Sequence, residues 1–235
     1  MLSDTEIDQV IDEDFLGYHH MSPMGIGKPV PAEYYEHFNG LLPRPILRAW
    51  ERFGFDGFSN GKLWLTDPIE YAPAIDAWLN GLDLPFNDTW HCLTQSALGR
   101  LALWGEKTGK SLSINVPVCT IWPNRDAAEK AQNATRRDRQ ALSLLSNPRL
   151  DVNDSEKKTY IESIIRNLGE LEPGQMYAYS IPLNKGGEED LDNLTIVDAI
   201  PYLIGVANST KRTLGADLLA ENRASIDSFL SHLSR

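Results

Sequence analysis

The clearest hydrophobic pattern in the chain lies between residues 89 and 114. Apolar and aromatic runs alternate there with turns that contain Gly99 and Gly109; the runs are 90–96, 100–105 and 110–114. Alternate residues of a strand face opposite sides of a sheet, so Trp90 and Cys92 share one face. This spacing predicts an antiparallel β-meander. A small sheet with one apolar face needs helices packed over it.

The first residues of the chain follow a helical spacing instead. Ser3 or Asp4 is suited to cap a helix, and an apolar stripe follows, made of Ile7, Val10, Ile11 and Phe15. Asp8 and Asp12 then lie on the opposite face, and Gly17 ends the helix. We therefore expect an amphipathic helix whose outer face is acidic.

The remaining pattern predicts further helices and strands around the meander. A helix from Asp67 is the best marked, because an N-cap aspartate is followed by Pro68 at the first helical position. Helices are also predicted at 34–38, 43–54, 125–145, 154–168, 198–207 and 217–233, and strands at 62–66, 116–122, 175–181 and 194–197. The fold class is α+β, an antiparallel β-meander packed with helices and followed by a smaller, mostly helical α+β domain. We place the domains at residues 1–122 and 123–235.

The charge of the chain is unevenly distributed. The formal net charge is −11, and residues 1–40 hold eight acidic residues against one lysine, which gives −7 for that segment. An acidic protein repels DNA and anionic membranes and attracts basic partners, so we expect no direct nucleic-acid binding and no membrane binding. High negative charge also occurs in proteins for which it serves only solubility.

The chemical motifs of common enzymes and metal sites are missing from the sequence. His19 and His20 are adjacent but have no further ligands at a suitable spacing, and the Asp190–Asn193 run does not continue into a calcium loop. Cys92 and Cys119 lie in apolar surroundings typical of buried thiols. We expect no metal, no cofactor and no catalytic residues. The sequence shows neither a secretory signal nor a long apolar span, so we expect a cytoplasmic protein.

Two groups of motifs carry a family resemblance. Residues 53–58, 63–71 and 99–106 resemble the GAD-like domain of bacteria. Residues 171–179, Gly186-Gly187 and 193–198 are similar to the small domain that usually follows it. The resemblance implies an immunity protein of a type VI secretion system, which binds and neutralises a cognate DNase toxin in the cytoplasm as a heterodimer. It also implies that the protein is not an enzyme.

The resemblance brings no list of toxin-binding residues, so charge and exposure must supply candidates. We expect contacts from the acidic first helix, the loop after it and the acidic loop near residue 189; the candidates are Asp8, Asp12, Glu13, Asp14, Tyr18, His19, His20, Glu188, Glu189 and Asp190. One alternative is an enzyme or a small-ligand-binding module that uses the cleft between the domains. Another is a scaffold protein with a peptide partner.

Overall fold

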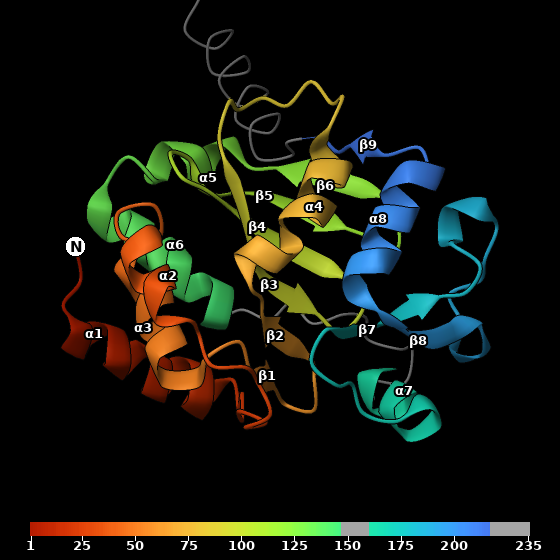
Figure 1. Cartoon of the computed structure of the whole chain (residues 1–235), viewed down its shortest axis with the longest axis horizontal. Coiled ribbons are helices and arrows are strands. Elements are labelled where there is room, and N and C mark those ends of the chain that lie inside the picture. Colours follow the sequence, from red (N-terminus) through yellow and green to blue (C-terminus); the bar gives the residue numbers. More distant parts are fainter. Residues whose placement is uncertain (147–159, 217–235) are drawn as a thin grey trace, which may run out of the picture.

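The computed structural model describes residues 1–146 and 160–216, and its centre is a seven-stranded sheet (Figure 1). In spatial order the strands are β1 (Gly57–Phe58), β2 (Leu63–Leu65), β3 (Trp90–Ser96), β4 (Arg100–Gly105), β5 (Gly109–Asn115), β6 (Thr120–Pro123) and β9 (Thr213–Leu214). The first six pair antiparallel with their sequence neighbours, and β9 pairs parallel with β6. The predicted meander and the α+β class are confirmed.

Glycines make the two tight turns of the meander possible. Gly99 joins β3 to β4 with φ 79°, and Gly109 opens β5 with φ 66°. Side-chain-bearing residues rarely adopt positive φ, because the Cβ atom approaches the backbone. The turn positions could therefore be predicted from the sequence.

Both faces of the sheet are buried, whereas the sequence analysis expected a single apolar face. Leu93 and Trp104 point into one hydrophobic cluster, and their neighbours Cys92 and Leu103 point into another. Alternate side chains of a strand project to opposite sides, so a strand that is apolar at consecutive positions is covered on both. The expectation of one apolar face was wrong because helices cover both.

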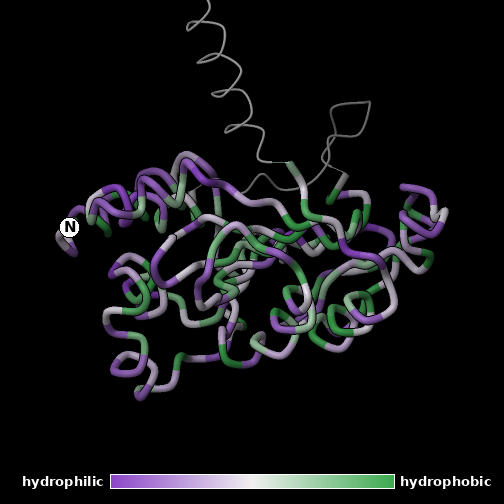
Figure 2. Tube along the Cα trace, turned by 90° about the horizontal axis from the view of Figure 1, so that it is seen from above, coloured by the Kyte–Doolittle hydropathy of each residue, from purple (hydrophilic) through white to green (hydrophobic). Residues whose placement is uncertain are grey.

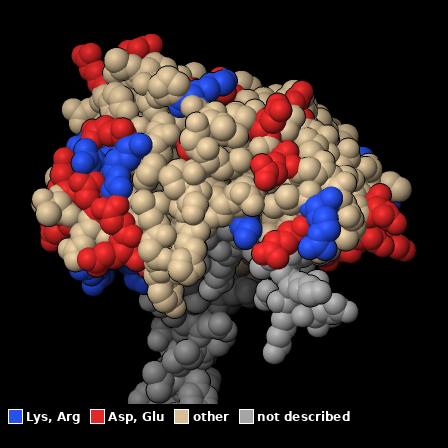
Figure 3. Space-filling model, turned by 90° about the horizontal axis from the view of Figure 1, so that it is seen from below, with Lys and Arg blue, Asp and Glu red and all other residues tan. Residues whose placement is uncertain are grey.

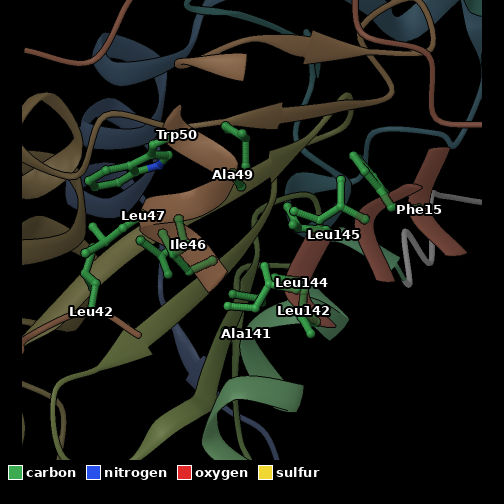
Figure 4. Packing of buried hydrophobic residues seen from close by; sticks show 14 of the residues in the cluster. Phe15, Leu42, Ile46, Leu47, Ala49, Trp50, Ala141, Leu142, Leu144 and Leu145 are labelled. Atoms are coloured by element: carbon green, nitrogen blue, oxygen red, sulfur yellow. The ribbon is translucent and has the colours of Figure 1, made fainter. Parts of the chain in front are cut away.

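The helices form a layer on each side of the sheet. One layer contains α1 (Asp4–Val10), the π-helix η1 (Ile11–Tyr18), α3 (Arg44–Phe53) and α6 (Ala134–Ser146), whose apolar residues pack together in Figure 4. The other contains α4 (Pro68–Leu79) and α8 (Ala199–Ser209). The short α2 (Ala32–His37) precedes α3. Apolar residues concentrate in the interior and polar residues on the outside (Figure 2).

The helix starts follow the capping signals. The Ser3 side chain accepts a hydrogen bond from the Glu6 backbone N–H, and the Glu6 side chain accepts one from the Ser3 backbone. Asp67 accepts from the backbone N–H groups of Ile69 and Glu70 at the start of α4. Each cap satisfies donors that the first helical turn leaves without partners. Both predicted starts are confirmed.

The predicted helix at 125–145 is in fact two helices. Helix α5 (Arg125–Lys130) ends before Ala131, and Asn133 opens α6 by accepting a hydrogen bond from the Arg136 backbone N–H. Asparagine competes for backbone groups in this way, which favours a cap over a helix interior. The Arg137 guanidinium lies 5.0 Å from the centre of the Trp104 ring, and burial lowers its pKa.

The C-terminal part of the described chain packs tightly on the first part. It comprises α7 (Tyr160–Leu168), the paired strands β7 (Gln175–Tyr179) and β8 (Leu194–Asp198), the short 3₁₀ turns at 183–185 and 191–193, and α8. The indole N–H of Trp78 in α4 donates to the Leu203 carbonyl of α8 at 3.0 Å, and one hydrophobic cluster draws on both helices. The division at residue 122 stays a prediction. The predicted helix at 217–233 lies outside the described residues.

Most of the tryptophans belong to the core. Trp50, Trp64, Trp78 and Trp104 are buried, and Trp90 is partly buried. Trp122 in β6 differs, with 39% of its surface exposed. Each of these large rings buries a large apolar area in the core.

Candidate functional site

The acidic outer face of the first helix is matched by arginines from α3. We call this set the charge ladder; it consists of Asp4, Asp8, Asp12, Glu51, Arg44, Arg48 and Arg52. Arg48 donates to both carboxylate oxygens of Asp8, at 2.9 and 2.7 Å. Arg44 likewise donates to both carboxylate oxygens of Asp4, and Arg52 donates to Asp12 at 2.6 Å.

The sequence spacing explains why the ladder forms. The three aspartates and the three arginines each recur every fourth residue, which places each set in a row along its own helix. Packing of the apolar stripe of α1 against α3 then brings the two rows together. Glu51 joins the arginine row by accepting hydrogen bonds from Arg44 and Arg48.

The ladder lowers the pKa values of the carboxyl groups of Asp4, Asp8 and Glu51. Hydrogen bonds from Arg48 lower the pKa of Asp8, those from Arg44 lower the pKa of Asp4, and Arg44 and Arg48 together lower that of Glu51. Ionised carboxylates are therefore favoured in the folded protein. In Figure 3, acidic and basic atoms interleave over this end of the molecule, so the ladder's carboxylates are largely neutralised within the chain.

The remaining candidates near the first helix have fewer charged partners within the described chain. Glu13 accepts a hydrogen bond from Gln9 and forms no ion pair within the described residues. An Asp14 carboxylate oxygen lies 3.6 Å from Nε2 of His19. Tyr18 is 77% exposed. His20 has φ 52°, and its carbonyl accepts a hydrogen bond from Ser59. Glu13 and Tyr18 therefore offer a partner more than Asp8 and Asp12 do.

The second candidate group lies at the far end of the molecule. Glu188, Glu189 and Asp190 belong to the loop before β8, and Figure 1 places this loop and α1 at opposite ends of the long axis. Asn193 fixes the loop by donating to the Glu188 carbonyl at 2.9 Å, and Asp190 caps the following 3₁₀ turn. The structure therefore does not bring the two candidate groups together.

The junction between the two parts of the chain contains a small cavity. Its lining includes Trp64, Tyr71 and Gln95 from the first part and Gly174 from the second, and its volume is about 50 Å³. The Tyr71 hydroxyl donates to Gln95 at 2.8 Å, and burial raises the tyrosine pKa. Ligand pockets usually enclose about 300–1,000 Å³. This cavity is too small for the ligand site that the alternative hypothesis needs.

Potential metal ligands and nucleophiles are scattered or buried. Across residues 1–146 and 160–216, no three His, Cys, Asp or Glu side chains gather as a metal site requires. Cys92 is fully buried, and burial raises its pKa to about 12. A thiol acts as a nucleophile in its ionised form, which burial disfavours here.

The structure contains a groove beside α4 that the sequence does not predict. It runs between the C-terminal half of α4 and residues 82–90, has a volume of about 890 Å³, and is lined by Asp76, Asp83 and several partly buried apolar side chains. The available signal was the mixture of acidic and apolar residues in Asp83-Leu84-Pro85-Phe86, a segment to which no element was assigned.

Comparison with known proteins identifies both parts of the chain. Residues 16–118 match the GAD-like domain, and residues 139–206 match the C-terminal domain of the type VI secretion system (T6SS) immunity protein Tdi1. Comparison with curated proteins yields no match. Within the described residues, no helix combines the length and apolar character needed to cross a membrane.

A solved structure shares the fold. The crystal structure of Atu4351 from Agrobacterium tumefaciens matches with a TM-score of 0.72 and 21% sequence identity, covering 86% of this chain and 90% of that chain. The two family matches follow each other in the order that the sequence motifs predict. This chain therefore belongs to the family of type VI secretion immunity proteins in which a GAD-like domain precedes the Tdi1 C-terminal domain.

Proposed function

We propose that the protein binds a cognate DNase effector of a type VI secretion system in the cytoplasm and neutralises it as a stoichiometric inhibitor. The match of residues 139–206 to the Tdi1 immunity domain carries this proposal. An immunity protein needs a toxin partner, and binding alone is sufficient for protection. The protein needs no reaction of its own, and its inhibitory mechanism is occlusion of the nuclease active site or DNA-binding surface.

The charge of the chain supports a nuclease as the partner. A DNase presents basic residues to the phosphates of its substrate, and the net charge of −11 attracts such a surface. Complementary charge raises association rates and makes them sensitive to salt. A protein that must reach its toxin before the toxin reaches the chromosome benefits from fast association.

The predicted contact residues form two groups at opposite ends of the molecule, and each group can be tested separately. Asp8 and Asp12 are occupied by arginines of α3, so replacing them disturbs the fold as well as any contact. Glu13 and Tyr18 at one end, and Glu188 and Glu189 at the other, are exposed and avoid this problem. Asp14, His19, His20 and Asp190 neighbour these positions and stay predictions.

Co-expression with a candidate DNase effector of the type VI secretion system from the same genome tests the function. We expect cells that make the nuclease alone to lose their chromosome, cells that also make this protein to survive, and the two purified proteins to elute as one complex in size-exclusion chromatography. A catalytically inactive nuclease serves as the control for toxicity. Absence of protection, or separate elution at micromolar concentrations, would contradict the proposal.

Charge reversal at each end then locates the contact. A variant with Glu13→Lys and Tyr18→Ala tests the first end, and one with Glu188→Lys and Glu189→Lys tests the second. We expect the affected end to show slower association, because exposed charges act mainly on the encounter. Unchanged binding of both variants would place the interface elsewhere on the molecule.

A further inference from the structure

The groove beside α4 has the composition of a docking site. Leu79, Leu84, Phe86 and Trp90 contribute its apolar surface, and all four are partly buried. The Phe86 and Trp90 rings lie 6.2 Å apart between centres. An apolar centre with a polar rim is the usual anatomy of a protein interface.

The groove is preformed, because both of its walls are fixed. On the loop side, Asp88 accepts hydrogen bonds from the Thr108 backbone N–H at 2.8 Å and from its hydroxyl at 2.6 Å. On the helix side, the Arg212 guanidinium donates to the carbonyls of Ala77 and Trp78 at 2.6 and 2.7 Å. A preformed site loses less conformational entropy when a partner binds.

The charged side chains that line the groove are acidic. No lysine or arginine belongs to its lining, while Asp76 and Asp83 are exposed and form no ion pair within the described residues. Arg212 reaches the end of α4, where its guanidinium donates to the carbonyls of Ala77, Trp78 and Asn80. The groove therefore attracts a positively charged partner and offers that partner apolar surface to bury.

We propose that this groove is the surface on which the effector nuclease docks, through a segment in which lysines or arginines flank an apolar or aromatic side chain. The inference rests on the proposed function and adds the location and chemistry of the contact. Asp76 and Asp83 pair with the cations, and the apolar side chain inserts between Phe86 and Leu79. The groove lies on α4 and the segment after it, between the two ends named above (Figure 1).

The test measures binding of a catalytically inactive form of that candidate DNase effector. The rim variant, Asp76→Lys with Asp83→Lys, reverses the charge at the rim of the groove. The α2 variant, Glu33→Lys with Glu36→Lys, makes the same change in net charge on exposed residues of α2. We expect the rim variant to weaken binding at least about tenfold, mainly through slower association, and the α2 variant to change it less than about threefold.

A second substitution tests the apolar part independently of charge. Phe86→Ala should raise the dissociation rate about tenfold or more and leave the association rate nearly unchanged, as expected for a central apolar contact. Circular dichroism of the free variants shows whether each one is folded. The rim variant keeps the test decisive if Phe86→Ala unfolds, because Asp76 and Asp83 are exposed.

The possible outcomes separate the two proposals. If the wild-type protein binds the nuclease and the rim and α2 variants weaken binding equally, the docking proposal is wrong and the proposed function stands. Wild-type protein that fails to bind would overturn both. If the free wild-type protein elutes as a dimer and the rim variant as a monomer, the groove binds a second copy of this chain. The docking proposal would then be wrong.

Discussion

In the charge ladder, Asp8 accepts two hydrogen bonds from Arg48, whereas at the groove Asp76 has no ion-pair partner in the described chain. Both aspartates lie on the outer face of a helix in an acidic protein. Asp8 helps to hold α1 against α3, whereas Asp76 contributes negative electrostatic potential around the groove. The number of acidic residues in a segment therefore differs from the negative charge that the folded segment presents to a partner.

Helix α4 should be held by the core as firmly as α1 is. Replacing Trp78 tests this and should cause the largest loss of stability. Trp78 is fully buried and bonded to the Leu203 carbonyl, so Trp78→Ala should lower the free energy of unfolding by about 3–5 kcal/mol. Urea denaturation measures it. Trp122→Ala, at a ring that is 39% exposed, is the control and should cost less. Equal losses would show that the groove wall is not anchored by the core.

Acid should weaken the ladder, and this effect comes next. The carboxyl pKa values of Asp8 and Glu51 lie below their ordinary values of 3.8 and 4.5 in the folded protein. A lowered folded pKa gives stability that is present above the ordinary pKa and lost as pH falls through the folded value. Arg48→Met removes this contribution, so the stability gap between wild type and variant should be full at pH 6 and narrow below about pH 4.

Denaturation of both proteins between pH 3 and pH 6 measures that gap. Arg136→Met is a matched control, because Arg136 is an exposed residue of α6 whose side chain forms no ion pair in the described residues. Its difference from wild type should not follow the same pH course. A gap that stays constant for Arg48→Met would mean that the ladder makes no net contribution to stability.

The first residues of the two helices allow a smaller comparison. Asp67 caps α4 with two backbone hydrogen bonds and also accepts one from the Tyr34 hydroxyl, so Asp67→Ala should cost about 1–2 kcal/mol. Ser3→Ala removes the cap of α1, and the ladder still holds that helix on α3. We expect Ser3→Ala to cost about half as much. Thermal or urea denaturation ranks the two variants, and a larger loss for Ser3→Ala would reverse the comparison.

Local signals made much of the fold predictable, and long-range pairing made the rest unpredictable. Asp67-Pro68 and Gly99 mark their structures through capping and positive φ, which depend on neighbouring residues only. The pairing of Asp8 with Arg48 joins residues forty positions apart, so the sequence shows the charges without showing that they cancel. The break at Asn133 was missed because its apolar neighbours continue a helical spacing.

The groove could not have been predicted for the same reason. Its walls are an amphipathic helix and a segment without periodic pattern, and the arrangement depends on contacts of Asp88 with Thr108 and of Arg212 with Ala77. The first is a contact between two loops, and the second joins residues 135 positions apart. A list of charged residues favours the N-terminal segment, where acidic residues are dense, over two isolated aspartates near residue 80.

The smallest expected effect gives the most direct contrast, because the same substitution is made in both regions. Asp76→Asn and Asp83→Asn remove charges that have no ion-pair partner in the described chain, so each should change the free energy of unfolding by less than about 0.5 kcal/mol. Asp8→Asn keeps the size of the side chain but leaves Arg48 facing a neutral amide, so it should lower stability measurably. Urea denaturation at pH 7 compares the three variants. If Asp8→Asn is as neutral as the other two, the ladder is only a surface feature and its aspartates are as available to a partner as those of the groove. If Asp76→Asn or Asp83→Asn destabilises the protein to the same degree as Asp8→Asn, the groove's carboxylates serve the fold, and the distinction between the two regions fails.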